Sequence, residues 1–533
     1  MVKAEKTLPR EIDKMGLESD VIVIGSGLGG LTAGAVCAKA GMRVLVLERN
    51  EQFGGAATVY RHNGLAIEVS LHEMDGLDDD DPKMPLIRLL GLDRSLQFAD
   101  VGDLYEVRAA VIGDPFVLPH GVEAALTATV TRFPKHKAGL EEYFRRLTAL
   151  RGAVSMAAQH MDNGTWWLTH APEALRRLWP LLRNGRATLG DVMNELFGAD
   201  EAVKFVLAAN LVYYHDDPDR MQFLRYAIPQ ASYLAGGGRY VRGGSQALSD
   251  QLMALIAQAG GKLRSNREAE RLLIDGQSVV GVEHRARDGS DPRVDKAPLV
   301  FGNAAPQVLC TMLPEDRRGE FLAPYASRRP SISLWTVSLG LNRPAREFGV
   351  RHYSTFIVPD WMRSFSQMRE AAAAIGGPPG ERMPPYVFVD YSQIDSGLNE
   401  TGPSLVSYCG ADGLENWARI DPMEMKARKE KWIDCLIADI NRHFPGIAGA
   451  VVHREMATAR TMQRYLNTPG GAVYGFAPEG TLVQTITQGP RTAIKGLWLA
   501  SAFTGGGGFT GAMIGGAQAA RQAMQEFKAR ARK

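Results

Sequence analysis

The segment SDVIVIGSGLGGLTAGAVCAKAGMRVLVLERN, residues 19–50, constrains the fold more than any other part of this chain. Residues 21–24 form a short apolar run, which predicts a buried strand. A G-x-G-x-x-G loop follows, and then an alanine-rich helix is expected over residues 31–39, closed by a glycine. Residues 42–48 predict a second strand. This order predicts a β-α-β unit and therefore a parallel sheet of Rossmann type.

Each position of the glycine loop has a physical reason in a dinucleotide-binding turn. Gly25 permits the tight turn, Gly27 lets the backbone approach a pyrophosphate, and Gly30 lets the helix pack closely on the strand. The helix N-terminus attracts phosphates, so Leu28 and Gly29 are further candidates for cofactor contacts. The combination of strand, loop and helix therefore predicts a dinucleotide site.

The residues after the second strand narrow the choice of dinucleotide. Glu48 stands at the end of that strand, where a carboxylate can accept hydrogen bonds from ribose hydroxyls. Arg49 follows it, and Gly54, Gly55 and Ala56 come a few residues later. This glycine pair resembles the one that FAD-binding proteins of the amine oxidase and phytoene desaturase group carry beneath the pyrophosphate and the ribityl chain. NAD enzymes have no need of it, so the resemblance implies FAD.

The bulk composition excludes several classes of protein. The 533 residues exceed one ordinary core, which predicts two or more domains. The net charge is +2, from 61 basic and 59 acidic residues without a basic block, so no nucleic-acid partner is expected. The four cysteines are far apart and no His-Glu-x-x-His motif occurs, so no metal site is predicted.

The sequence shows neither a signal peptide nor a membrane span. The N-terminal residues are charged and lack an apolar centre, and no run of about 18 apolar residues occurs. Widely spaced cysteines fit a reducing compartment. We expect a cytoplasmic protein, with peripheral contact at the inner face of a membrane left open.

Several further segments extend the resemblance along the chain. With the two glycine motifs, they resemble the phytoene desaturase, carotenoid isomerase and retinol saturase family of amine oxidase-like flavoproteins. The segments are NGLAIEVSLHEMDG (63–76), the stretch that begins RYVRGGSQALSDQ (239–284), PLVFGNAAP (298–306), RTMQRYLNTPGGAVYGFAP (460–478) and GLWLASAFTGGGGFTGAMIGGAQAA (496–520).

The resemblance implies where the rest of the flavin would lie. The backbone near Ala269 would hold the adenine edge, and the strand before Asn303 would return to the cofactor domain. The four glycines at 505–508 would join a strand directly to a helix whose N-terminus faces the flavin. The expected contacts there are Ser501, Ala502, Thr510, Gly511, Ala512 and Met513.

One departure from the family pattern falls in this last segment. Many relatives end the strand in Gly-Asp, with the aspartate bonded to a ribityl hydroxyl, whereas Ser501 and Ala502 occupy the matching positions here. The loss of that hydrogen bond predicts weaker retention of FAD, unless Ser501 or backbone amides compensate.

Three polar residues in segments that return to the flavin are the catalytic candidates. His72 and Glu68 could transfer a proton, and Tyr474 could line the cavity or donate a hydrogen bond. Structural roles are the alternatives: Glu68 could pair with Arg61 or His62, and His72 could hold a loop.

The cofactor segments are too far apart in sequence to be separate domains. They predict one discontinuous, Rossmann-like FAD-binding domain from residues 18–75, 240–310 and 455–527. The two inserts, 76–239 and 311–454, are expected to build a mixed α+β, partly helical substrate-binding domain. The first insert is interpreted as largely helical, and strands are expected in the second.

Three stretches of the inserts have local interpretations. Residues 165–193 are amphipathic, rich in tryptophan and arginine, and interrupted by Pro180. They could lie in a membrane interface or pack on their own domain. The acidic residues 75–85 are expected to form a solvated loop, and residues 371–385 a surface loop.

The resemblance implies an FAD-dependent oxidoreductase acting on carbon–carbon bonds of a hydrophobic isoprenoid, terpene or polyene. Desaturation, saturation and flavin-mediated isomerisation stay open. The alternatives are an amine oxidase-type flavoenzyme and a flavin-free isoprenoid carrier like the Rab GDP dissociation inhibitors. The sequence leaves the oligomeric state open.

Overall fold

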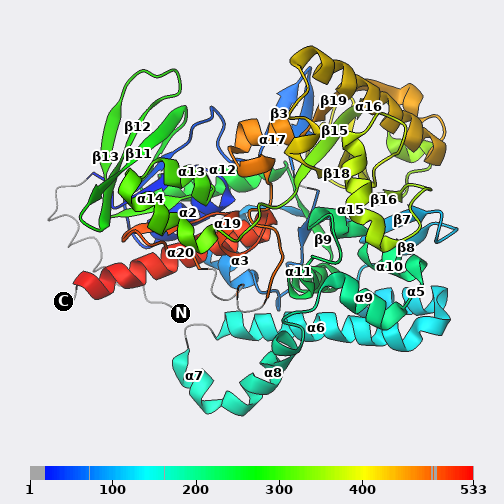
Figure 1. Cartoon of the computed structure of the whole chain (residues 1–533), viewed down its shortest axis with the longest axis horizontal. Coiled ribbons are helices and arrows are strands. Elements are labelled where there is room, and N and C mark those ends of the chain that lie inside the picture. Colours follow the sequence, from blue (N-terminus) through cyan, green and yellow to red (C-terminus); the bar gives the residue numbers. More distant parts are fainter. Residues whose placement is uncertain (1–17, 71, 161–162, 482–483, 485–488, 532–533) are drawn as a thin grey trace.

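The computed structural model describes residues 18–70, 72–160, 163–481, 484 and 489–531, and it confirms the α/β class (Figure 1). Among these residues, no helix is both long enough and apolar enough to span a bilayer.

A five-stranded parallel sheet contains the predicted β-α-β unit. β1 pairs with β2 on one side and with β14 on the other, and β10 and β20 form the two edges. The three central strands are buried along their whole length, because both faces of a parallel sheet are covered. The bounds are β1 Val21–Ile24, β2 Val44–Leu47, β10 Lys262–Arg264, β14 Leu299–Gly302 and β20 Leu497–Leu499.

Different layers cover the two faces of this sheet. Val21 and Val23 share a core with α2, α12 and α20, whereas Ile22 and Ile24 share a core with the antiparallel sheet β11–β12–β13. The bounds are α2 Leu28–Lys39, α12 Ser245–Gln258, α20 Gly508–Ala531, β11 Arg267–Asp275, β12 Ser278–Ala286 and β13 Arg293–Lys296.

A seven-stranded sheet lies beside this assembly (Figure 1). The first insert contributes β7 and β8 to it, so that insert is less purely helical than expected. α16 packs against its neighbour β19. The order is β19 Val451–Ala457, β15 Ser333–Leu341, β18 Ser404–Asp412, β17 Tyr386–Asp390, β16 Ser354–Val358, β7 Tyr105–Ala109 and β8 Phe116–Leu118; α16 spans Pro422–His443.

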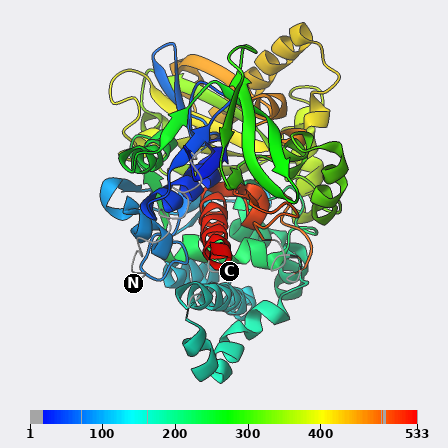
Figure 2. The ribbon, with the colours of Figure 1, turned by 90° about the vertical axis from the view of Figure 1, so that its left-hand side faces the viewer.

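The rest of the first insert is mainly helical, and α7 and α8 project at the edge of the molecule (Figures 1 and 2). The helices are α3 Met84–Leu90, α4 Leu92–Ser95, α5 Val122–Arg132, α6 Lys137–Gln159, α7 Gly164–Thr169, α8 Ala171–Arg183, α9 Leu189–Phe197, α10 Glu201–Ala208 and α11 Phe223–Gly236.

Short elements connect these layers. The hairpin β3–β4 follows the second glycine pair, and β5 and β6 pair with the distant strand β9 in a small sheet. The bounds are β3 Val59–His62, β4 Leu65–Glu68, β5 Met74–Asp75, β6 Phe98–Asp100, β9 Gly238–Val241, α13 Pro306–Thr311, α14 Glu315–Leu322, α15 Met368–Ala372, α17 Ala459–Leu466 and α19 Ala502–Gly505.

Three local predictions differ from the structure. Pro180 lies inside the last turns of α8, and the break in the amphipathic stretch falls at His170 instead. Residues 371–385 are not simply a surface loop, because helical turns bury Ala371 and Ile375. The one-turn helix α19 stands between β20 and α20, so the glycines do not join the strand directly to the long helix.

Candidate active site

The first glycine loop runs from β1 into α2 at the carboxyl end of the parallel sheet. Gly25 has a φ of +90°, which favours glycine. A Cβ atom at Gly27 would lie 2.6 Å from Nδ2 of Asn303, and one at Gly30 would overlap the carbonyl oxygen of Gly25. The N-cap Gly27 offers no side chain to cap α2, so the first amides of this helix are suited to a phosphate.

Ser26 joins the parts of the nucleotide site. Its backbone amide and hydroxyl both donate to Oε2 of Glu48, at 2.9 and 2.7 Å, and its hydroxyl accepts the amide of Gly54 at 3.0 Å. Asn50 donates its amide to the other carboxylate oxygen of Glu48 at 2.8 Å. Sequence reasoning missed Ser26, although its place inside the glycine motif was a usable signal.

The second glycine pair contacts the first loop. Gly54 and Gly55 have φ angles of +119° and +63°. A Cβ atom at Gly55 would lie 3.0 Å from Cα of Gly27, so the two loops approach each other backbone to backbone. The half-buried Arg49 donates to the carbonyl of Arg464, while its enclosed Nε has no hydrogen-bond partner among the described residues. A donor left unpaired beside two glycine loops fits an anionic ligand.

Asn303 and Ala269 border this site from two other strands. The amide of Asn303 donates to the carbonyl of Ile24 at 2.8 Å, and its side chain lies against the first glycine loop. Ala269 is buried on β11, whose first residue Arg267 donates its amide to the carbonyl of Glu48 at 2.7 Å. Asn303 thus contacts the first glycine loop, Ala269 lies on the strand whose first residue is bonded to Glu48, and Ala56 leads from the second glycine pair towards β3.

The C-terminal candidates lie in and between α19 and α20. The Ser501 hydroxyl caps α19 by accepting the amide of Phe503 at 3.3 Å and donates to the carbonyl of Ala304 at 3.5 Å. This hydroxyl is already engaged within the protein. Ala502 is the first residue of α19, and α20 begins at Gly508, two residues before Thr510. Gly511 and Ala512 are half-buried in its first turns, and Met513 is buried.

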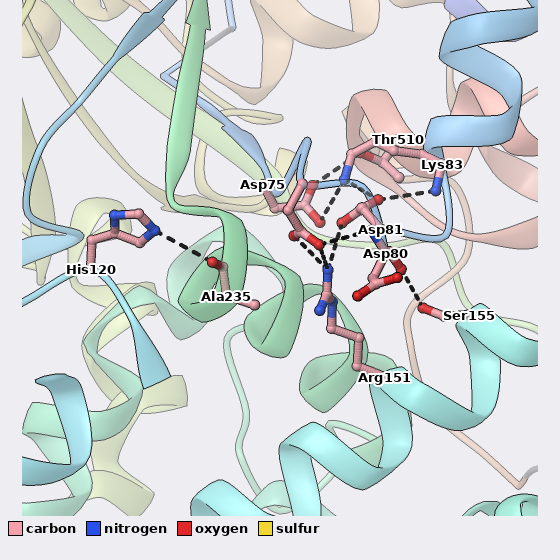
Figure 3. A network of polar contacts seen from close by, with 10 residues as sticks. Asp75, Asp80, Asp81, Lys83, His120, Arg151, Ser155, Ala235 and Thr510 are labelled. Atoms are coloured by element: carbon pink, nitrogen blue, oxygen red, sulfur yellow. Dashed lines mark hydrogen bonds and ion pairs between the residues drawn. The ribbon is translucent and has the colours of Figure 1, made fainter. Parts of the chain in front are cut away.

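The acidic stretch that follows β5 is not the solvated loop expected from the sequence. Asp81 and Lys83 are both buried and form an ion pair of 2.7 Å. Asp75 accepts the Thr510 hydroxyl at 3.0 Å and lies 3.5 Å from Lys83, so the stretch is bound to the start of α20 (Figure 3). Arg151 of α6 pairs with Asp78 from the opposite side. Charge pairing therefore fixes this segment between the nucleotide layer and the helical insert.

His72 lies in a buried, tyrosine-rich environment. Its Nδ1 is 2.8 Å from the hydroxyl of Tyr213, its Nε2 is 3.3 Å from the hydroxyl of Ser407, and its carbonyl accepts the hydroxyl of Tyr353. Burial lowers the pKa of His72 to about 4, so the imidazole is neutral at neutral pH. One nitrogen can donate and the other accept, which is the form needed to relay a proton.

Glu73 is a functional candidate that sequence reasoning missed. Its Oε1 accepts the hydroxyl of Tyr233 at 2.7 Å, while its Oε2 is enclosed without a hydrogen-bond partner among the described residues. Burial raises the pKa of Glu73 to about 8, although the Tyr233 hydrogen bond opposes this shift. The carboxyl is therefore protonated at neutral pH and can act as an acid. Its position next to His72 was the only sequence signal.

Tyr474 reaches the same interior from the C-terminal segment. A Cβ atom at Gly507 would overlap the Cβ of Tyr474, so this residue packs on the glycine loop. Burial raises the pKa of Tyr474 above its ordinary range. The pKa of Tyr213 is also raised, first by burial and then by the nearby charges of Glu73, Cys409, Tyr391 and Tyr474. These shifts leave His72, Glu73, Tyr213 and Tyr474 uncharged at neutral pH.

Glu68 does not join this cluster directly. Among the described residues its partners do not include Arg61 or His62, and His62 pairs with Glu455 instead. Its carboxylate accepts the amide of Ser245 at 2.8 Å and the hydroxyl of Tyr240 at 3.1 Å. These bonds connect β4, which follows the second glycine pair in sequence, to the start of α12.

The fold and the glycine loops define a Rossmann-type nucleotide-binding protein, and the sequence comparisons place it among oxidoreductases. The family described as "NAD(P)-binding Rossmann-like domain" matches residues 23–88. All-trans-retinol 13,14-reductase from Danio rerio is 24% identical over 536 residues, covering 93% of this chain and 84% of that protein. Prolycopene isomerase from Daucus carota is 23% identical over 486 residues, covering 87% and 73%. The chain is a homologue of these retinol reductases and prolycopene isomerases, which confirms the predicted resemblance.

Solved structures share the fold at lower sequence identity. An oxidoreductase from Methanosarcina mazei has a TM-score of 0.60 and 16% identity, covering 95% of this chain and 99% of that one. Cyclohexylamine oxidase from Brevibacterium oxydans also has a TM-score of 0.60 and 16% identity, covering 96% and 100%. These likenesses establish the architecture of the whole chain.

Proposed function

We propose that the chain binds FAD and uses it to change carbon–carbon bonds of a hydrophobic isoprenoid or polyene. The contact between the two glycine loops, with Ser26 linking both to Glu48, is the observation that carries the cofactor proposal. Glu48 would hold the ribose, the amides of α2 the pyrophosphate, and the start of α20 the flavin end. When bound, FAD supplies reversible hydride uptake at its ring.

The substrate class follows from the chemistry of the interior and from the homologues. Neutral His72, protonated Glu73 and the buried Tyr213 are hydrogen-bonding groups without net charge. Such a lining favours a neutral, apolar substrate over an ionised one. The homologues' names include a retinol reductase and a prolycopene isomerase, so polyene saturation and polyene isomerisation are both candidate reactions.

We assign the proton-handling role to His72 and Glu73, with Tyr474 lining the substrate space. Glu73 holds a proton at neutral pH, and the His72–Tyr213 hydrogen bond fixes the orientation of the imidazole. Addition or removal of a hydride at a polyene carbon must be matched by a proton at the neighbouring carbon. Glu68 acts as a positioning residue, since Ser245 and Tyr240 occupy its carboxylate.

We further propose that α7 and α8 rest on a membrane surface from which the substrate is taken. Their apolar side chains remain exposed: Leu168 by 83%, Leu175 by 63%, Trp179 by 60% and Leu182 by 56%. Arg176, Arg177 and Arg183 are exposed on the same helix. An amphipathic helix with tryptophan and arginine matches the chemistry of an anionic lipid interface.

Anaerobic mixing of the FAD-loaded protein with a panel of isoprenoids tests the function. The panel includes all-trans-retinol, a cis-configured carotene and a saturated isoprenoid alcohol. Oxidation of a substrate bleaches the flavin, pre-reduced protein regains its colour on saturation, and an isomer of unchanged mass marks isomerisation. Hydrogen peroxide production with amines but not isoprenoids would instead identify an amine oxidase, and binding of isoprenoids by a protein unable to hold FAD would identify a carrier.

A further inference from the structure

Two histidines and a glutamate meet where the hairpin β3–β4 contacts the edge of the seven-stranded sheet. His62 ends β3, while His453 and Glu455 lie two residues apart on β19 and therefore on one face of that strand. Nδ1 of His62 is 2.7 Å from Oε2 of Glu455, and Nε2 of His453 is 3.7 Å from the same oxygen. All three donor atoms lie within 4.8 Å of one another.

The unpaired Nε2 of His453 is a second observation that points to a ligand, beside the grouping of the three donor atoms. Only 10% of its side chain is exposed, and its Nε2 is enclosed without a hydrogen-bond partner among the described residues. A buried polar nitrogen left unpaired is destabilising unless a ligand occupies the position facing it.

Tyr60 contacts the carboxylate of Glu455 and orients it. The Tyr60 hydroxyl donates to Oε1 of Glu455 and leaves Oε2 facing the two histidines. An outer hydrogen bond of this kind orients a metal-binding carboxylate. Zn²⁺ binds imidazole nitrogen and carboxylate oxygen at about 2.0–2.2 Å, which places tetrahedral donors roughly 3.2–3.6 Å apart. The observed separations of 2.7 and 3.7 Å bracket that spacing.

We propose that His62, His453 and Glu455 bind a divalent transition-metal ion of the Zn²⁺ class, with solvent in the fourth position. The sequence carries no motif for this site, because 393 residues separate His62 from Glu455. The ion would tie the β3–β4 hairpin to β19. That hairpin connects the second glycine pair to Glu68 and, beyond it, to His72, so the site is structural and separate from the proposed flavin chemistry.

Competition titration of the full chain with Zn²⁺ against a chromophoric chelator tests the site. One equivalent should bind to the wild type, and Co²⁺ in its place should give the visible absorption of a tetrahedral complex. H62A and E455Q should weaken binding by more than the roughly 10–100-fold that loss of an outer partner costs, whereas Y60F should fall within that range. H352A is the matched control, because His352 also faces a carboxylate, Asp103, at 3.3 Å.

Each outcome decides the proposal. Stoichiometric binding that survives in H352A and is lost in both H62A and E455Q supports it. Failure of the wild type to bind one equivalent overturns it, as does equal binding by all four variants, which marks adventitious surface metal. His62 is exposed and E455Q is nearly isosteric, so both variants should fold, and circular dichroism checks this. The result is independent of flavin content.

Discussion

At the scale of single residues, small side chains bring the nucleotide site together. Ser26 bonds to Glu48 and to Gly54, so one hydroxyl links the first strand, the second strand and the second glycine pair. Gly27 and Gly55 touch through their backbones. Larger side chains at these positions would separate the loops before any ligand bound.

Glu73→Gln should change how stability depends on pH. The pKa of Glu73 rises from an ordinary 4.5 to about 8 through burial, so the unfolded chain releases this proton before the folded protein does. Its contribution to stability is complete below pH 4.5 and is lost as the pH rises through about 8. Urea unfolding at pH 5 and pH 8 should show a smaller loss of unfolding free energy in the variant than in the wild type. Glu320→Gln, an exposed change on α14, is the control; equal losses in all three proteins would contradict the assignment.

Ala502→Asp should tighten FAD binding. The Ser501 hydroxyl is engaged with Phe503 and Ala304, so it is a poor substitute for the carboxylate that relatives carry at the next position. A charge-assisted hydrogen bond is worth about 1.5–3 kcal/mol, which corresponds to a roughly 10- to 150-fold lower dissociation constant. Flavin fluorescence titration measures it, with Ala502→Asn as the neutral control. An unchanged or weaker affinity in the aspartate variant would refute this account of the departure.

At the scale of elements, α8 is unusual because three of its large apolar side chains, Leu175, Trp179 and Leu182, are exposed. Within this helix only Ala174 is buried. The helix also packs on its own domain, since it contacts α6 and Leu181 lies against the core, so both interpretations from the sequence keep support. Leu175, Trp179 and Leu182 recur at helical spacing and form one apolar stripe.

The double variant Trp179→Glu, Leu182→Glu should lose affinity for vesicles. Two carboxylates in the stripe cannot enter the lipid interface without a large desolvation cost. Co-sedimentation with vesicles that contain an anionic phospholipid measures the loss, and vesicles of phosphatidylcholine alone should bind the wild type less. Met423→Glu is the matched control, since Met423 is 84% exposed on a different helix. Equal binding by the wild type and the double variant would remove α8 as the contact.

The sequence predicted local elements well, but it predicted contacts between residues far apart in the chain poorly. The strand at 21–24 and the two glycine motifs follow from short-range patterns, and these elements match the structure. By contrast, Asp81 is buried because Lys83 pairs with it inside the fold, and composition alone suggested a solvated loop. The raised pKa of Glu73 likewise depends on burial beside Tyr233, which donates a hydrogen bond to it from 160 residues away in the chain. Patterns report propensity, whereas burial of a polar group depends on its partner.

At the scale of the whole molecule, three separate segments of the chain supply strands to the nucleotide sheet. β1 and β2 come from the N-terminal segment, β10 and β14 from the middle, and β20 from the end. We propose the same discontinuous division for the domains, with residues 76–239 and 311–454 as the substrate-binding part. The seven-stranded sheet draws strands from both of these inserts. Asp75 and Thr510 then join the start of one insert to the last helix.

The visible absorbance of the purified protein after reconstitution with FAD tests the central claim most directly. The wild type should retain about one flavin per chain. Gly55→Val should retain none, because a side chain there meets Cα of Gly27 at 3.0 Å and Gly55 has a φ of +63°. Gly64→Ala is the control: Gly64 also has a positive φ but open space around it. A folded wild-type protein that stays colourless, or a Gly55→Val variant that binds FAD as the wild type does, would contradict the account.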